Sequence, residues 1–515
     1  MYQPKFHQLT FETFYLPFGG KLDRNNRWIK LADSIPWHLA EERYSKKFPS
    51  KRGAPALTVR MALGALIIKE KLGLTDVETV EQIKENPYLQ YVIGLEGYQY
   101  EAPFDASSMT HFRKRLKHAD LAALQDELLQ MQQAKKQTMS RKNDDDDVPG
   151  TGSANQGRLI VDATCAPADI SYPTDHGLLN DAREKSEILI DKLYAHAPAG
   201  ISKPRTYGQK ARRDFLGLSM KRNSSKRLIQ RGLRKQLQYL GRNLKSIAAL
   251  SKSVSLTLLE PRWYRTYLVI SELYRQQHEM YQTGRKSISD RLVSISQPHV
   301  RPLVRGKAAA RTEFGMKLSI SVVAGWSTIE RMSWNNYNEG CDLVGDIERY
   351  RDRYGYYPES VHADKIYRTL ANRMWCKKYG IRLSGVPLGR PPKDQEKNRA
   401  RRRQIREDEG IRNAVEGKFG QAKRKYSLSR VMARLAESSQ TVVSLVFLVM
   451  NLEHLLSVHF LHFFGVLKHS QEASIRFLDR LVRPYQQEGK MELMQTAVTF
   501  SMQFEETLIC SVTPS

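Results

Sequence analysis

The segments RLIVD at residues 158–162 and SVHAD at residues 360–364 share one pattern, in which a short apolar run ends in an aspartate. Runs of this length without alternation are typical of strands that are buried on both faces. The end of such a strand opens onto a loop, where a polar side chain can act on a ligand. The two segments therefore predict an α/β fold with Asp162 and Asp364 at the ends of two core strands.

A helix around residue 416 offers a third carboxylate. Three charged residues share one side of this helix at 3.6 residues per turn, namely Arg412, Glu416 and Lys423. The adjoining apolar stripe, which would pack on a sheet, consists of Ile411, Val415, Phe419 and Ala422. A carboxylate and two cations are thus expected at the border of the helix face that covers the sheet.

Two strand-end aspartates and one helix glutamate suit phosphodiester chemistry. Cleavage and transfer of a phosphodiester commonly use two hard cations about 3.5–4 Å apart. Mg²⁺ prefers oxygen ligands and keeps several waters, so a few carboxylates suffice, and Mn²⁺ can substitute for it. We therefore predict Asp162, Asp364 and Glu416 as catalytic residues and metal ligands, with Arg412 and Lys423 placed to contact DNA phosphates.

The composition favours a polyanionic partner. The 515 residues include 82 Lys and Arg against 55 Asp and Glu, a formal net charge of +27. Such a charge is costly in self-repulsion, and neutralisation of phosphates by Lys and Arg supplies most non-specific affinity for nucleic acid. Four cysteines without a C-x-x-C pair give no support to a zinc site. The apolar stretch 442–467 contains Asn, Glu and His, which predicts core helices and no membrane span.

The chain is expected to have four parts. Residues 1–133 show helical periodicity, and Thr75 with Glu78 forms a capping-box pattern. The last helix of this part is basic, so a DNA-binding helix-turn-helix and a plain helical bundle both fit. A polar linker, 134–157, precedes the catalytic part, 158–465, and a tail follows at 466–515.

A basic helical insertion is predicted within the catalytic part, at about 184–300. Between residues 203 and 245 the chain has fourteen Lys or Arg and a single acid, Asp214. We expect the segment 225–247 to form a helical hairpin whose leucines face a core. The cations that would then face DNA are Arg227, Arg231, Arg234 and Lys235.

Four stretches of the chain resemble the DDE transposases of bacterial insertion sequences, in the insertion-sequence four and five superfamily. They are LIVDATCAPADISYPTDHGLLNDARE around Asp162, TEFGMKLSISVVAGW, HADKIYRT around Asp364, and RNAVEGKFGQAKRKYSL around Glu416. The N-terminal stretch ALTVRMALGALIIKEKLGLTDVETVEQIKENPYLQYVIGL resembles the leading domain of the same group. The resemblance covers most of the chain.

The resemblance implies an RNase H-like catalytic core, divalent metal, terminal inverted repeats as substrate, and strand cleavage followed by transfer to target DNA. Arg412, Glu416 and Lys423 match the last three members of the superfamily's Tyr-Arg-Glu-Lys signature, whereas the Tyr position holds Glu409. The basic insertion lies between the two aspartates, whereas some relatives insert a domain after the second. A homodimer on double-stranded DNA, in the bacterial cytoplasm and nucleoid, is the expected working state.

Each site residue has a structural alternative. Asp162 could be a turn residue, with Asp169 and Asp175 as rivals, and Asp364 could cap the following helix. Glu416 could be a surface carboxylate like Glu407, paired only with Arg412. His362 fits a packed strand residue better than a metal ligand. Alternative functions are a nuclease that cuts without joining and an inactive, repressor-like DNA binder.

Overall fold

The computed structural model describes residues 2–4, 10–16, 20–49, 55–140, 155–304, 312–387 and 394–458. The chain divides into two compact units, Met1–Leu452 and Glu453–Ser515, and the fold below is that of the first. The acidic run 144–147 of the predicted linker and the predicted tail 466–515 lie outside the described residues.

Within the described residues a six-stranded mixed sheet is built around β1 (Arg158–Pro167). On one side β1 pairs antiparallel with β3 (Thr312–Val323), and on the other it pairs parallel with β5 (Ser360–Ala363). β6 (Arg382–Leu383) extends the parallel side. On the far edge of β3 lie two further antiparallel strands, β2 (Arg301–Val304) and β4 (Trp326–Ser333). This mixed sheet confirms the α/β fold class expected from the sequence.

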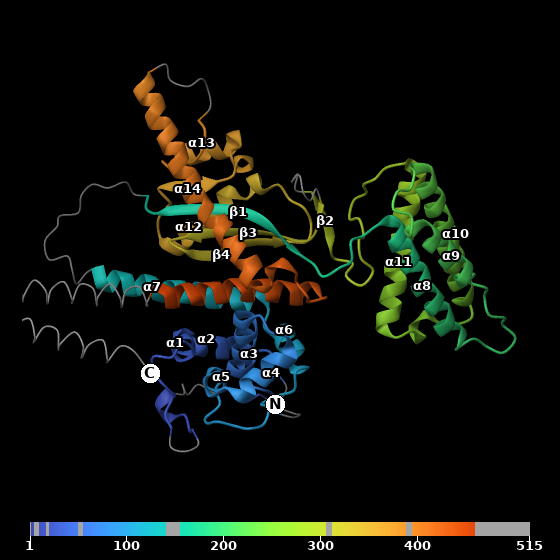
Figure 1. Ribbon diagram of the computed structural model, residues 1–515, viewed down its shortest axis with the longest axis horizontal. Helices are drawn as coiled ribbons and strands as arrows, with labels where there is room; N and C mark the ends of the chain where they lie inside the picture. Colours follow the sequence, from blue (N-terminus) through green and yellow to red (C-terminus); the bar gives the residue numbers. More distant parts are fainter. Residues whose placement is uncertain are drawn as a thin grey trace, which may run out of the picture. The chain divides into compact units, whose positions relative to one another are not determined.

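Helices cover both faces of this sheet (Figure 1). One face packs against α12 (Leu343–Tyr354) and α13 (Leu370–Lys378) through an apolar cluster that includes Leu159 and Val161 of β1 and Val361 of β5. The long helix α14 (Gln395–Lys425) crosses the sheet and buries Val415, Phe419 and Ala422. These three residues belong to the apolar stripe predicted for this helix.

The N-terminal helices begin and end where the sequence indicates. Thr58 accepts a hydrogen bond from the Met61 amide at the start of the third helix, and Gly73 ends that helix in the left-handed conformation. Thr75 Oγ1 accepts from the Glu78 amide at 3.1 Å, as the capping-box pattern predicts. This part contains α1 (Arg27–Ser34), α2 (Trp37–Ser45), α3 (Val59–Leu72), α4 (Asp76–Glu85), α5 (Pro87–Val92), α6 (Ser108–Arg115) and α7 (His118–Ser140). α7 thus extends past residue 134, where the linker was expected to begin.

Between β1 and β2 in the sequence the chain forms a helical bundle, which corresponds to the predicted basic insertion (Figure 1). Its members are α8 (Asp175–Tyr194), α9 (Gly208–Ser219), α10 (Lys226–Leu250) and α11 (Pro261–Thr283). They enclose a separate apolar core that contains Leu237 and Leu240. The expected hairpin within 225–247 is wrong, because this segment belongs to one continuous helix and the hairpin forms with α9. No proline interrupts the segment, and leucines at helical spacing pack it against the bundle core despite Gly232 and Gly241.

The apolar stretch near the C-terminus forms the helix Ala436–Val458. Its length and composition would let it cross a membrane, but 67% of its apolar window is buried inside the protein, as in a core helix. The side chain of Asn451 connects this helix to the sheet. It accepts a hydrogen bond from the Ser327 amide and donates one to the Ser327 carbonyl, each at 2.9 Å. The expectation of a core helix fits this burial.

At Gly315 of β3 the backbone of β1 approaches so closely that there is no room for a side chain. A Cβ atom at this position would lie 2.2 Å from the Ala166 carbonyl oxygen, a backbone atom that cannot move aside. We predict that Gly315→Ala lowers the free energy of unfolding by about 2 kcal/mol or more in chemical denaturation. Gly217→Ala is the control, since it lies in α9 with open space around it and should stabilise the protein by about 0.5–1 kcal/mol. Equal effects of the two substitutions would contradict the packing at Gly315.

Candidate active site

The parallel pairing of β1 with β5 brings two aspartates together. The register pairs Val161 with Ala363, so Asp162 and Asp364 follow at adjacent positions on neighbouring strands. Asp364 ends its strand as expected and accepts a hydrogen bond from the Lys365 amide at 2.6 Å, which caps a short 3-10 helix, η5 (Lys365–Tyr367). The capping role and a catalytic role of Asp364 are therefore compatible.

The predicted strand end at Asp162 is wrong, because β1 continues to Pro167. What ends at Asp162 is the pairing with β5, since β5 stops at Ala363. Beyond this point β1 remains paired with its antiparallel partner β3, in which Ile320 lies opposite Asp162. The sequence after Asp162 does not show this, because the support for the longer strand comes from a segment about 150 residues away.

Side chains alternate along a strand, so even-numbered residues of β1 and β5 share one face of the sheet. Odd-numbered residues such as Val161 pack toward α12 and α13. On the even face, the fully buried His362 of β5 has its Nδ1 3.6 Å from the Asp408 carboxylate of α14. Asp162 and Asp364 lie on this same face, which α14 covers.

Glu416 lies on α14, but its carboxylate pairs with Arg412 at 3.2 Å, and its side chain is 55% exposed. The positive charge of Arg412 in turn acts on Asp162, where it lowers the pKa of that carboxyl. Arg412 thus interacts with both carboxylates, as an ion pair with Glu416 and through its charge with Asp162. Among the described residues no group of three His, Cys, Asp or Glu side chains forms a ready metal site.

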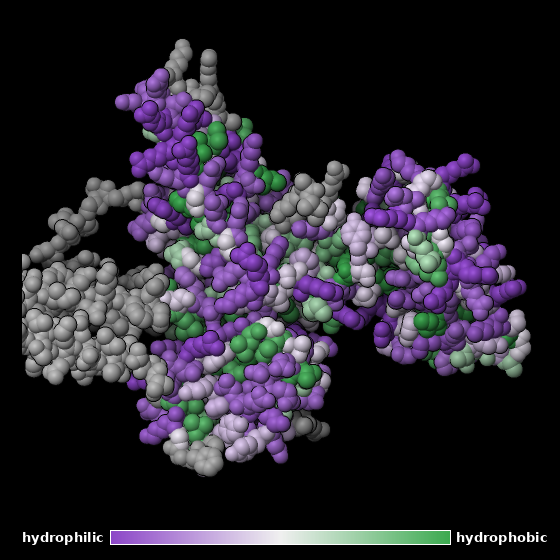
Figure 2. Space-filling view, in the orientation of Figure 1, coloured by the Kyte–Doolittle hydropathy of each residue, from purple (hydrophilic) through white to green (hydrophobic). Residues whose placement is uncertain are grey.

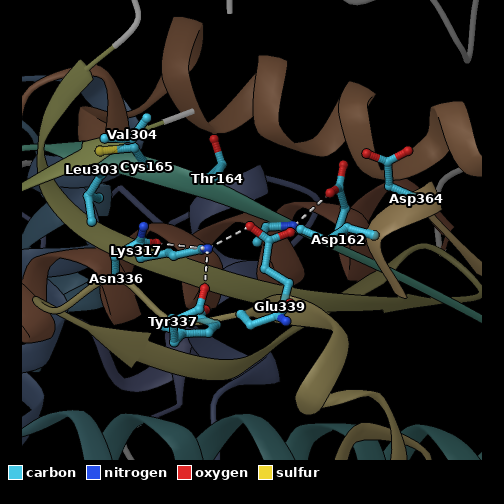
Figure 3. Close-up of a pocket in the computed structure, with 13 residues that line it drawn as sticks. Asp162, Thr164, Cys165, Leu303, Val304, Lys317, Asn336, Tyr337, Glu339 and Asp364 are labelled. Carbon is cyan, nitrogen blue, oxygen red and sulfur yellow. Dashed lines mark hydrogen bonds and ion pairs between the residues drawn. The ribbon is translucent and has the colours of Figure 1, made fainter. Parts of the chain in front are cut away.

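A cavity of about 650 Å³ opens beside the two aspartates, where β1 runs past the end of β5. Figure 3 shows the carboxylates of Asp162 and Asp364 next to each other at one end of it. Deeper in, Lys317 Nζ donates to the Tyr337 carbonyl at 2.7 Å and pairs with Glu339 at 2.8 Å. Glu339 is a site carboxylate that the sequence analysis missed. It begins a short 3-10 helix, η4 (Glu339–Cys341), and only the tertiary structure brings it to Asp162.

Burial, above all, raises the pKa of Asp162 to about 6, and the negative charges of Glu339 and Asp364 act in the same direction. The amide of Ala163 opposes them by donating to the Asp162 carboxylate at 2.8 Å. Carboxylates that destabilise one another's charge favour a cation between them. The oxygen donors and their electrostatics therefore fit a hard divalent metal ion.

The rival acids are used elsewhere. Asp169 pairs with Arg430, and Asp175 pairs with Arg291 at 2.6 Å and accepts from Gln277 at 2.9 Å. Ion pairs of this kind hold the chain after β1 to the C-terminal part and to the bundle. On α14, Glu407 accepts from its neighbour Arg403 at 2.9 Å.

Two family models match the chain. Residues 17–115 match a "Transposase domain (DUF772)", and residues 361–453, which include Asp364 and Glu416, match a "Transposase DDE domain". A Rhizobium meliloti protein, "Uncharacterized protein ORF8 in nfe locus", is 33% identical over 190 residues, which are 36% of this chain and 80% of that protein. The chain belongs to the insertion-sequence DDE transposases. No solved structure matches it.

The cations that the sequence assigned to DNA divide into two groups in the transposase. Arg227, Arg231 and Arg234 are exposed on α10, on a bundle whose visible surface is largely hydrophilic (Figure 2). Lys235, by contrast, is half-buried and bonds Asp214 of α9 at 2.8 Å. The structure thus gives Lys235 a role in holding α9 to α10.

Two of the basic side chains of α6, Arg113 and Arg115, contact other residues of the protein. Arg113 donates to both carboxylate oxygens of Asp76 at 2.9 and 2.6 Å, and Arg115 lies over the Phe48 ring at 4.8 Å. Lys117 pairs with Glu437 at 3.4 Å. Lys114 of α6 is exposed, so the two interpretations of this segment, a DNA-binding helix-turn-helix and a plain helical bundle, both stay predictions.

Asp162 should destabilise the fold when it is ionised. Because its pKa is raised, the folded protein binds this proton more tightly than the unfolded chain, and stability is lost as the pH rises through about 6. We predict that Asp162→Asn raises the free energy of unfolding by about 1–3 kcal/mol above neutral pH. The gain should vanish below about pH 4, where both states hold the proton. Urea unfolding across pH measures this.

The exposed Asp364 provides the control for that experiment. Water screens its charge, so Asp364→Asn should change stability less than Asp162→Asn does. A loss of stability in Asp162→Asn at neutral pH would mean that the carboxylate is not under electrostatic strain.

Proposed function

We propose that this transposase cuts DNA at terminal inverted repeats and joins the ends to target DNA, with Asp162, Asp364 and Glu416 holding two divalent metal ions. The observation that carries the proposal is the side-by-side placement of Asp162 and Asp364 on the sheet face that α14 crosses. Mg²⁺ is the proposed ion, with Mn²⁺ as a substitute, because the donors are carboxylate oxygens. When bound, the ions would polarise the phosphate and lower the pKa of the attacking water.

The protein residues have distinct proposed parts. Asp162 and Asp364 are fixed by the sheet and by hydrogen bonds from the following amides, so they need little rearrangement to bind a cation. Glu416 would complete the ligand set by leaving Arg412, a change of side-chain rotamer on a helix that already covers the site. The released Arg412 would then be free to contact a DNA phosphate.

The way α14 packs on the sheet determines which positions the Glu416 side chain can occupy. Asp408, 5% exposed, accepts two hydrogen bonds from Arg382 of β6, at 2.9 and 2.8 Å, and faces His362 of β5. Asp408 lies eight residues before Glu416 on the same helix, about two turns away. We propose that this contact fixes the rotation of α14 over the sheet and so the direction of Glu416.

The proposal extends to the fold and the assembly. β1, β3 and β4 form antiparallel pairs, and β5 and β6 follow parallel to β1; with helices on both faces, this order supports the RNase H-like core that the family resemblance implies, to which the short strand β2 is added. Transposon ends and target DNA must be brought together for joining, so we propose a homodimer on double-stranded DNA. The +27 charge supports a DNA substrate.

Neutral substitutions test the three carboxylates. Asp162→Asn, Asp364→Asn and Glu416→Gln should each lower the rate of Mg²⁺-dependent cleavage of transposon-end DNA by about a thousandfold or more. Each removes a charged metal ligand worth several kcal/mol at nearly constant shape. Glu407→Gln, on the solvent side of the same helix, should cleave at the normal rate.

Glu339 is the competing third ligand, because it already lines the cavity. If Glu339→Gln abolished cleavage and Glu416→Gln did not, the choice of Glu416 would be wrong. Normal cleavage by all four variants would refute a carboxylate-metal mechanism and leave a DNA-binding protein without this activity. A joining assay with pre-cut ends separates a transposase from a nuclease that only cuts.

If the exposed cations of α10 contact DNA phosphates, the affinity for DNA should depend more steeply on salt concentration when they are present. For duplex DNA the log–log slope changes by about 0.9 for each phosphate contact. We predict that changing Arg227, Arg231 and Arg234 together to Gln flattens the slope by about 2 to 3 units and weakens binding to all sequences alike. Lys235→Gln should change it little, because Lys235 bonds Asp214. An unchanged slope in the triple variant would exclude this surface from DNA contact.

A further inference from the structure

Two arginines follow Asp364 closely in the chain. Asp364 and Arg368 cap the two ends of η5, in which the Tyr367 amide donates to the Asp364 carbonyl at 3.0 Å and the Arg368 amide donates to the Lys365 carbonyl at 3.1 Å. Arg373 lies in the next helix, α13. Both arginine side chains are half-buried. The turn that presents the proposed catalytic carboxylate therefore also presents two guanidinium groups.

Buried hydrogen bonds hold this turn in place. Asn372, 5% exposed, donates from its side-chain amide to the Gly340 carbonyl at 2.6 Å and to the Tyr367 carbonyl at 2.8 Å. These bonds connect η5 and α13 with η4, which forms part of the cavity wall. The guanidinium of Arg368 lies against Gly385, where a Cβ atom would come within 2.6 Å of Nη1. The two arginines therefore extend from a backbone that is fixed relative to the candidate site.

Neither guanidinium has an acceptor within the part of the chain that the structure describes. The Nε atoms of Arg368 and Arg373 are buried without a hydrogen-bond partner, and neither side chain forms an ion pair with a carboxylate among the described residues. A buried donor without an acceptor is costly, because it has given up its hydrogen bonds to water. Both side chains therefore have unused capacity to donate hydrogen bonds to a ligand.

Positive charge dominates this segment. Residues 365–383 include six Lys or Arg and no Asp or Glu. Burial lowers the pKa of Arg368, and the positive charge of Arg373 adds to this effect, whereas the charge of Asp408 opposes it. The Asp408 carboxylate already accepts two hydrogen bonds from Arg382, at 2.9 and 2.8 Å. Like charges that act on each other at a partly buried position suit an anionic ligand.

The geometry of the turn favours a DNA phosphate as that ligand. Arginine presents its donors in a planar fork that matches two oxygens of one phosphate. A 3-10 helix rises about 2 Å per residue, so Arg368 lies about 8 Å from Asp364 along η5. Phosphates of one duplex strand follow one another at about 3.4 Å along the helix axis. A strand whose scissile phosphate reaches Asp364 would thus bring the phosphate about two nucleotides away to Arg368.

We propose that Arg368 and Arg373 bind phosphates of the DNA strand that enters the candidate active site, next to the phosphate that is cut. This inference rests on the proposed function, because it assigns further contacts to the same DNA. Contacts beside the scissile bond would hold that bond at Asp162 and Asp364. They would act on every DNA sequence alike, since phosphate contacts carry no base information.

The test is a salt titration of binding to a short duplex of mixed sequence, with the full chain and no divalent metal. Changing Arg368 and Arg373 together to Gln should flatten the log–log slope by about 1 to 2 units. Changing both to Lys keeps the charge but loses the planar fork, so the slope should stay close to that of the parent while binding weakens severalfold. The matched control changes Arg275 and Arg351 to Gln. Each of these arginines already pairs with two carboxylates, so the slope should stay nearly unchanged.

Thermal unfolding without DNA separates a binding role from a structural one. Because the charges of Arg368 and Arg373 repel each other, the double Gln variant should unfold at the same temperature as the parent or higher. An unchanged salt slope, an equal effect of the control, or a lower unfolding temperature of the double Gln variant would each overturn the proposal. If the parent protein bound the duplex normally in these cases, the proposed transposase function would stand; if the parent did not bind DNA, both would fail.

Discussion

Four backbone pairs between β1 and β5 decide where the two aspartates of the candidate site lie. Parallel strands need a long crossover connection, and here just over 200 residues separate Asp162 from Asp364. The pairing nevertheless places the two carboxylates side by side, at a point where β1 gains its support from β3 alone. The cavity lies beside that placement, and the charge of Asp364 adds to the burial that raises the pKa of Asp162.

Repulsion among these carboxylates shapes the surrounding protein. Lys317 holds Glu339, and Arg412 holds Glu416 while its charge also acts on Asp162. Two protein cations thus offset part of the negative charge that would otherwise gather at one end of the sheet.

The long helix α14 joins the parts of the transposase. Near its middle, Asp408 bonds Arg382 of the sheet, and just beyond its end Ser427 bonds Glu70 of α3. Val415 and Phe419 pack between these two points. Because the helix is held at both points, Glu416 and the end of the helix keep defined positions relative to the sheet and to the N-terminal helices.

Local patterns were sufficient to predict much of this protein. The apolar run before Asp162, the cap at Thr75 and the stripe at Val415 each depend on neighbours within a few residues, where propensity and periodicity act. The same is true of the separate basic bundle, whose leucines repeat at helical spacing. The family motifs supplied the remaining links between Asp162, Asp364 and Glu416.

Contacts between distant segments were not visible in the sequence. Only the packed sheet shows that β1 continues beyond Asp162, because β3 provides the pairing. Only tertiary packing brings Glu339 to the site and pairs Lys235 with Asp214. The physical reason is that charge acts through space over several ångströms, whereas sequence periodicity reports only which face of its own helix or strand a residue occupies.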